Sequence, residues 1–167
     1  MIDPRFEALV ERHSAEIYAY LWRLLHDPDL ASDCLQDTYL RALRAFPSLK
    51  HHDQLRAWLY TIATHRAHSL QREDARDARR HQPLSDEQAD PRALVSRRAA
   101  DRDRLRRVLQ AVERLPAKQK EALILRRYQG LPYAQIAAVQ GGTTAAARMN
   151  VHLAQEKLRS VLADEDV

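Results

Sequence analysis

Residues 130–158 read GLPYAQIAAVQGGTTAAARMNVHLAQEKL, which is a pattern of short helix, glycine turn and longer helix. Pro132 suits the first position of a helix, because its fixed φ angle is already helical and its missing N–H has no partner to lose there. Gly141 and Gly142 offer the positive φ angles that a tight turn between two helices needs. The stretch therefore predicts a helix-turn-helix, a unit that can place its second helix in a DNA major groove.

The second helix of this unit is expected to pack with one face and to contact DNA with the other. Thr143 or Thr144 can cap its start, and its first turn is the part that would reach base edges. The apolar face is predicted at helical spacing, on Val151, Ala154, Leu158 and Leu162. The candidate DNA-contacting residues in this part of the chain are Arg126, Arg127, Thr143, Thr144, Arg148 and His152. An ordinary helical bundle with basic surface residues is the competing interpretation.

The composition of the 167-residue chain favours helix throughout. Glycine occurs only three times, 45% of the residues are hydrophobic, and strand-like alternation is missing. Charge is uneven, since residues 101–167 hold twelve Lys/Arg against eight Asp/Glu, whereas residues 1–73 hold nine against ten. We therefore expect an all-α protein whose basic C-terminal part binds a polyanion and whose nearly neutral N-terminal part binds a protein.

The single cysteine and the hydropathy pattern bear on the compartment. Cys34 alone excludes a disulfide framework, and a small buried helix residue is a better interpretation of it than a redox thiol. No apolar run near residue 1 resembles a signal peptide, and no stretch is suited to span a bilayer. We therefore expect a soluble, cytoplasmic protein without membrane insertion.

Three helices are expected before residue 73. Asp3-Pro4 and Asp27-Pro28 are helix starts, because each places a capping residue before a proline. The second helix, ending near Phe46-Pro47, is predicted to bury Leu35, Leu40 and Leu43. Asp53 can cap the third helix, whose apolar face is predicted on Leu55, Trp58, Leu59, Ile62 and Ala63. These helices can share one core.

The helical pattern fails from about Arg72. Residues 74–92 are charged, lack aromatic residues and contain two prolines, which is typical of a flexible linker. We therefore predict two small helical domains joined by that linker. The predicted segments are a three-helix domain at 1–73, a linker at 74–100, a helix-turn-helix domain at 101–163 and an acidic tail at 164–167.

Two further stretches resemble a known family. Residues 33–42 read DCLQDTYLRA, and residues 56–63 read RAWLYTIA. With the helix-turn-helix in the same order and at the same spacing, the chain resembles the extracytoplasmic-function sigma factors of bacterial RNA polymerase over nearly its whole length. The first two stretches look like region two of that family, and the helix-turn-helix looks like its region four.

The resemblance implies a transcription initiation factor, not an enzyme, that needs no cofactor. Its implied partners are core RNA polymerase and promoter DNA. For the free protein two alternatives stay open: the two helical units pack on each other, or an anti-sigma factor clamps them. The helix with the first stretch binds the polymerase in the family, so the candidate polymerase contacts are Asp33, Gln36, Asp37, Leu40, Arg41 and Arg44. The loop and helix after it handle melted promoter DNA, so the candidate contacts there are Lys50, His51, His52, Arg56, His65 and Arg66. A solvated face with an Asp37–Arg41 pair is the competing interpretation of the first set.

The chain departs from the family's pattern in its DNA-contacting parts. The departures are His65, Ser69, Gln140, Ala146, Ala147, Asn150 and Leu153. The last four lie in the second helix of the helix-turn-helix and leave it less cationic than in typical members. A sigma-like interaction protein or regulator that no longer directs initiation is therefore the alternative function. A metal site at His65 and His68 is disfavoured, because no cysteine or glutamate-flanked histidine motif accompanies the two residues.

Overall fold

The structure is a computed structural model that describes residues 2–49, 54–80 and 97–163. All regular structure in these ranges is helical, which confirms the all-α prediction. The elements are α1 (Pro4–Leu25), α2 (Pro28–Ala45), the short 3-10 turn η1 (Phe46–Ser48), α3 (Leu55–Arg80), α4 (Arg97–Glu113), α5 (Ala117–Arg127), α6 (Tyr133–Gln140) and α7 (Thr144–Ala163). No helix in the described ranges is both long enough and apolar enough to cross a membrane.

Short sequence signals set the ends of the first two helices. Asp3 accepts a hydrogen bond of 2.9 Å from the backbone N–H of Arg5, and Asp27 accepts two from the first turn of α2. Between them His26 adopts a left-handed conformation, with φ of 56°, so the chain turns sharply from α1 into α2. Both predicted helix starts are therefore confirmed, whereas the predicted cap Asp53 lies outside the described residues.

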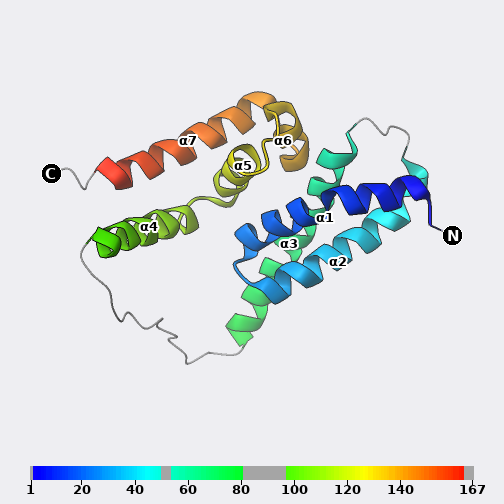
Figure 1. The fold of residues 1–167 in the computed structure, drawn as a ribbon, viewed down its shortest axis with the longest axis horizontal. Coiled ribbons are helices and arrows are strands. Elements are labelled where there is room, and N and C mark those ends of the chain that lie inside the picture. The colour runs from blue at the N-terminus through cyan, green and yellow to red at the C-terminus, as the bar shows by residue number, and fades with distance from the viewer. Residues whose placement is uncertain (1, 50–53, 81–96, 164–167) are drawn as a thin grey trace.

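Helices α1, α2 and α3 pack as one three-helix unit (Figure 1). Helix α2 turns small side chains to the core, and these are Ala31, Cys34, Thr38 and Ala42. The prediction that Leu40 lies in the buried face of this helix is wrong, because its side chain is 52% exposed. Leu35 and Leu43 are half-buried. Small inner residues allow α2 to approach its neighbours closely, and the leucines are displaced to its flank.

The C-terminal unit holds α4 to α7. Helix α7 packs against α4, α5 and α6, and α4 lies along it as the lower neighbour in Figure 1. A small apolar cluster of Leu115, Leu123 and Ala154, with Leu158 against it, joins α5 to α7. The predicted inner face of α7 is thus confirmed at Val151 and Ala154, which are 2% and 0% exposed.

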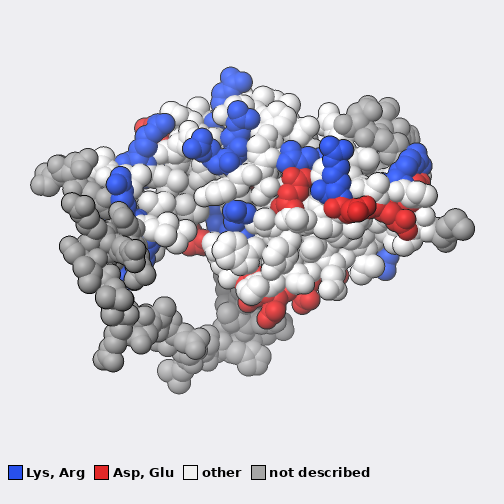
Figure 2. Space-filling view, viewed as in Figure 1, with Lys and Arg blue, Asp and Glu red and all other residues white. Residues whose placement is uncertain are grey.

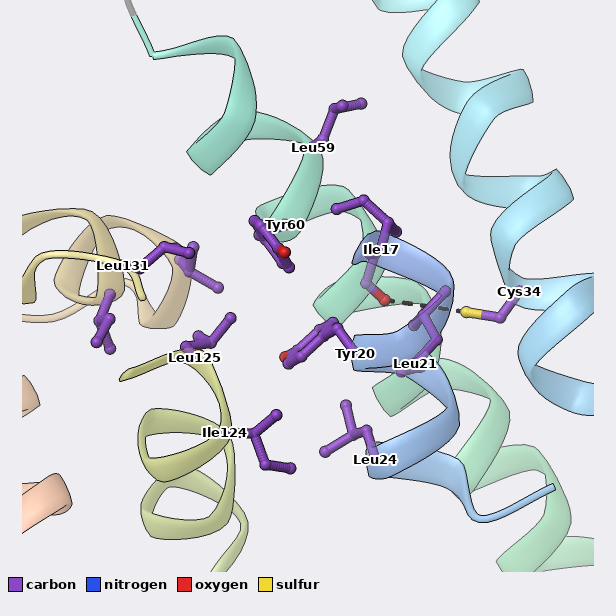
Figure 3. Close-up of a cluster of buried hydrophobic side chains, with 14 of the residues drawn as sticks. Ile17, Tyr20, Leu21, Leu24, Cys34, Leu59, Tyr60, Ile124, Leu125 and Leu131 are labelled. Atoms are coloured by element: carbon purple, nitrogen blue, oxygen red, sulfur yellow. Dashed lines mark hydrogen bonds between the residues drawn. The ribbon is translucent and has the colours of Figure 1, made fainter. Parts of the chain in front are cut away.

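The two units share one hydrophobic core. Tyr20 of α1 and Tyr60 of α3 meet edge to face, with ring centroids 5.2 Å apart. Figure 3 shows Ile124, Leu125 and Leu131 of the C-terminal unit pointing toward these two rings, and all five side chains belong to a single buried cluster. Burying one such aliphatic side chain stabilises a fold by about 1.5–3 kcal/mol. The three-helix unit and the helix-turn-helix unit are therefore packed together in this structure.

The structure describes only the two ends of the predicted linker. Helix α3 continues to Arg80, and α4 already begins at Arg97, so both ends of the 74–100 segment are helical. Residues 81–96 and the tail at 164–167 lie outside the described residues.

Candidate nucleic-acid interface

The helix-turn-helix is formed by α6, a three-residue turn and α7. Gly141 lies at φ of 63°, and the backbone N–H of Gly142 donates to the carbonyl oxygen of Ala137 over 2.9 Å, which ends α6. Gly142 itself has no positive φ angle, so the prediction of a left-handed conformation is confirmed only for Gly141. The hydroxyl of Thr143 accepts a hydrogen bond of 3.1 Å from the backbone N–H of Ala146 and therefore caps α7.

The candidate DNA contacts of the C-terminal unit differ in their exposure and in the contacts they make within the protein. Thr143, Thr144, Arg127, Arg148 and His152 are all exposed. Arg126, by contrast, is half-buried, donates a hydrogen bond of 3.1 Å to the carbonyl oxygen of Leu131 and lies over the ring of Tyr133. Arg126 thus holds the loop between α5 and α6, whereas the first five face solvent.

Basic side chains outnumber acidic ones over the C-terminal unit. Figure 2 shows Lys and Arg across the part of the surface formed by α4 to α7, whereas over α1 they alternate with acidic side chains and Asp and Glu gather over the start of α2. A surface of this sign attracts the phosphates of nucleic acid. The distribution agrees with the charge of the sequence, in which the C-terminal segment carries the excess of Lys and Arg.

Two of the unusual residues of the helix-turn-helix bind each other. The side-chain amide of Asn150 in α7 donates to Gln140 Oε1 over 3.3 Å, and Gln140 Nε2 donates to the carbonyl oxygen of Lys118 over 2.8 Å. Gln140 Nε2 also lies 3.3 Å from Glu121 Oε2, and the carboxylate of Glu121 accepts a short hydrogen bond from His68 of α3. A chain of hydrogen bonds therefore runs from the second helix of the helix-turn-helix to the three-helix unit.

The candidate polymerase contacts lie along one side of α2. Asp33, Gln36, Leu40, Arg41 and Arg44 are exposed, and Asp37 is half-buried. Asp37 Oδ2 accepts a hydrogen bond of 2.6 Å from Arg66 Nε of α3. The predicted alternative, a pair within α2, is therefore replaced by a pair between helices.

An apolar groove of about 660 Å³ runs beside these residues, between α1 and α2. Its lining residues are Ile2, Phe6, Glu7, Val10, Glu11, Gln36, Tyr39, Leu40 and Leu43. Leu40 at 52% and Ile2 at 46% exposure are the large apolar side chains that it offers to solvent. The two glutamates give the groove an acidic edge. An apolar floor with a charged edge is the usual anatomy of a protein-binding surface.

A second groove, between α2 and α3, gathers cationic side chains. It is lined by Arg41, Ala45, Trp58, Ile62, His65, Arg66 and Ser69, and it encloses about 300 Å³. Trp58 is half-buried and packs against Phe46, with ring centroids 6.4 Å apart, so it belongs largely to the core as predicted. Two of the candidate DNA contacts, His65 and Arg66, thus lie beside the candidate polymerase contact Arg41. Lys50, His51 and His52 lie outside the described residues.

Arg56, the remaining candidate, points into the contact between the two units. Its guanidinium donates to Glu16 over 2.7 and 2.9 Å and to the carbonyl oxygen of Gln129 over 2.6 Å. Burial disfavours ionisation of Glu16, but hydrogen bonds from Arg56 and His13 more than offset this and hold its pKa below the usual value. Tyr60 donates to the side chain of Gln129 over 3.1 Å.

A third set of contacts joins the end of α1 to α4 and α5. Lys120 Nζ lies 2.9 Å from Glu113 and 3.2 Å from His26 Nε2, and His26 also contacts Glu113 closely. Sequence reasoning missed Gln129, Glu121, Glu113 and His68 as residues that connect the units. Nothing local signals them, because the partner of each in the other unit lies 53 to 87 positions away in the chain.

Cys34 confirms its predicted structural role. Its side chain is fully buried in the three-helix unit, with Sγ 3.9 Å from the carbonyl oxygen of Ala63 (Figure 3). Burial raises the pKa of the thiol to about 11, so it stays protonated and unreactive at neutral pH. No group of three or more His, Cys, Asp or Glu suited to hold a metal ion occurs among the residues that the structure describes.

Comparisons with known proteins agree with this geometry. The family model of sigma-70 region 2 matches residues 9–77, and that of sigma-70 region 4 matches residues 105–158. The chain is 31% identical to the RNA polymerase sigma factor CarQ of Myxococcus xanthus, over 95% of this chain and 90% of that protein. It is 30% identical to the RNA polymerase sigma factor YlaC of Bacillus subtilis, over 92% and 89% respectively.

Solved structures show the same arrangement of helices. The sigma factor RpoE, in complex with the anti-sigma factor NepR from Bartonella quintana, matches with a TM-score of 0.76 and 24% identity, over 96% of this chain and 98% of that one. CnrH, in complex with the cytosolic domain of CnrY, matches with a TM-score of 0.68 and 25% identity, over 99% and 92%.

The fold and its grooves define a two-unit helical protein that binds DNA through a helix-turn-helix. The chain belongs to the extracytoplasmic-function type of bacterial RNA polymerase sigma factors, with sigma-70 regions 2 and 4. It is a non-enzymatic transcription factor that binds core polymerase and directs it to promoters.

Proposed function

We propose that this sigma factor docks on core RNA polymerase through the outer side of α2 and the adjoining groove between α1 and α2. The exposed Leu40 carries the proposal, because a leucine that is 52% exposed beside an apolar groove is suited to a protein partner. The proposed contacts are Asp33, Gln36, Asp37, Leu40, Arg41 and Arg44. Those with charge or hydrogen-bonding groups surround the leucine and would set the orientation of the partner.

We propose that promoter DNA meets both units. The groove between α2 and α3 offers His65 to the phosphates and bases of the melted strand, and Arg66 joins it once its guanidinium leaves Asp37 and Glu73. Helix α7 enters the major groove of the upstream duplex. The loop residues Lys50, His51 and His52 are proposed to contact the same melted strand. The protein acts in the cytoplasm, where core polymerase transcribes.

Arg56 can join these contacts only after it leaves its present partners. In the packed arrangement its guanidinium is held by Glu16 and Gln129, which belong to different units. Separation of the two units on polymerase would free it for a phosphate. We include an anti-sigma factor among the proposed partners, because the solved RpoE structure is a complex with the anti-sigma factor NepR.

Co-purification with core polymerase tests the docking surface. Leu40→Arg places a charge on the exposed position without touching the core, and we expect it to lose core polymerase at concentrations that retain the wild type. Met149→Arg, a change at an equally exposed apolar residue of α7, is the matched control and should keep core polymerase. Equal retention of both variants would refute the assignment of α2.

Transcription then tests the function as a whole. Run-off synthesis with core polymerase on genomic DNA fragments should depend on the wild-type chain and fail with Leu40→Arg. Polymerase binding without any run-off product would instead support the alternative of a sigma-like interaction protein.

A further inference from the structure

The exposed face of the recognition helix α7 is apolar at its centre. Ala147, Val151 and Ala154 are buried and mark the inner side of the helix. At 100° per residue, Ala145 and Met149 project from the opposite side. Both are exposed, and Met149 is 54% exposed although it is a large apolar side chain. The part of the helix that faces outward most directly therefore presents a methyl group and a thioether instead of a cation.

Polar groups flank this centre on one side. Arg148 lies with its guanidinium 5.4 Å from the ring centroid of Tyr133, which steadies it beside α6. Arg148 and His152 line a shallow groove between α6 and α7 together with Ala145 and Met149. Arg148 is the only Lys or Arg from residue 144 to 153, so one fixed cation borders an apolar strip.

The chemistry of the major groove selects what such a strip can contact. The edges of guanine, cytosine and adenine present hydrogen-bonding groups there, which a methionine or alanine would cover without replacing the lost water. Thymine alone presents a C5-methyl group, and apolar side chains contact it favourably. A helix with Met149 and Ala145 at its centre therefore fits thymine better than any other base.

We propose that Ala145 and Met149 read thymine methyl groups in the upstream promoter duplex, with Arg148 fixing the register through an adjacent guanine or phosphate. The proposal rests on the proposed function, which places α7 in the major groove. The presence of thymine at one or two adjacent positions would then be the main determinant of the sequence preference of α7. Loss of one buried methyl corresponds to about fourfold weaker binding.

Replacement of thymine by deoxyuridine tests the proposal, because the two bases differ only in the methyl group. Duplexes are first enriched from a random pool with the full-length chain in complex with core polymerase. Each thymine of an enriched duplex is then replaced singly by deoxyuridine, and affinity is measured. For the wild type we expect about fourfold weaker binding at one or two adjacent positions and no change elsewhere.

Variants locate the effect on α7. Met149→Ala should lose most of the discrimination between thymine and deoxyuridine at the position that Met149 contacts, while any position read by Ala145 stays sensitive. Leu105→Ala, at an equally exposed leucine of α4, should discriminate at every position as the wild type does. Circular dichroism confirms that both variants are folded. Wild-type affinity that is indifferent to deoxyuridine everywhere, or full wild-type discrimination at every position in Met149→Ala, would overturn the thymine proposal alone. Failure to enrich any duplex would overturn the placement of α7 in DNA, and with it the proposed function.

Discussion

The guanidinium of Arg56 in α3 donates a hydrogen bond to the backbone carbonyl oxygen of Gln129, which follows α5, over 2.6 Å. One side chain of the three-helix unit thus holds a loop of the helix-turn-helix unit, and Glu16 fixes the same guanidinium from α1. A residue that the sequence assigns to DNA contact is therefore a link between the units in this packed form.

Arg56→Met should destabilise the protein by about 1–3 kcal/mol, because the carboxylate of Glu16 and the carbonyl of Gln129 both lose a charged donor while the aliphatic stem is kept. Urea unfolding measures the change. Arg12→Met, at an exposed arginine of α1, is the control and should stay within about 0.5 kcal/mol of the wild type. The same midpoint for both variants would show that the link contributes nothing.

The contact between His68 and Glu121 should appear as a coupling energy. The side chain of Glu121 is 2% exposed, so removal of its donor leaves a buried carboxylate poorly paired. A double-mutant cycle with His68→Ala and Glu121→Ala should give a coupling of about 0.5–3 kcal/mol. The cycle that uses His65→Ala with Glu121→Ala should be additive, because His65 is exposed and lies one turn away. Additive behaviour of both cycles would contradict the contact.

The two glycines of the helix-turn-helix should respond differently to alanine. Gly141 has φ of 63°, where an alanine is strained, and Gly142 has no positive φ angle. An added Cβ meets no atom within 4 Å at either position, so only the backbone distinguishes them. Gly141→Ala should cost about 1 kcal/mol in unfolding free energy, whereas Gly142→Ala should be neutral or slightly stabilising. The reverse order would contradict the turn geometry.

Stability should fall at alkaline pH, in part because of Cys34. Burial raises the pKa of its thiol from 9.0 to about 11, so the folded state holds a proton that the unfolded state has lost between these values. The buried thiol thus contributes about 2–3 kcal/mol to the unfolding free energy below pH 9, and this contribution is lost as the pH rises through 11. Burial raises the pKa values of Tyr20 and Tyr60 in the same direction.

Cys34→Ala tests this contribution. The variant should lose less unfolding free energy than the wild type between pH 9 and 11, although its stability at pH 7 is reduced by the smaller side chain. Unfolding in urea at several pH values gives both slopes. Parallel slopes would show that the thiol does not titrate in this range.

Local signals in the sequence predicted the helix ends and the helix-turn-helix. Asp3, Asp27 and Thr143 cap helices through backbone groups two or three residues away, so a few neighbouring positions specify each start. Spacing of apolar residues likewise identified the inner face of α7. Gly142 was predicted wrongly because composition alone does not tell which glycine of a pair adopts the left-handed conformation.

Contacts between distant elements were not predictable in the same way. Leu40 has the apolar character and spacing of a core residue, but the small inner residues of α2 bring α1 and α3 to another side of the helix. Asp37 pairs with Arg66, 29 positions away, and not with the arginine one turn along. Gln140 and Asn150 looked like departures that weaken the family's pattern, and the structure shows them bonded to each other.

The shared core of the two units has a consequence for synthesis on the ribosome. Helices α1 to α3 emerge first, but the side of Tyr20 and Tyr60 that faces Ile124, Leu125 and Leu131 stays open until these residues have been made. The nascent three-helix unit therefore carries an uncovered aromatic face for as long as translation of the intervening residues lasts. Slow codons before residue 124 would prolong that interval and favour capture by a chaperone.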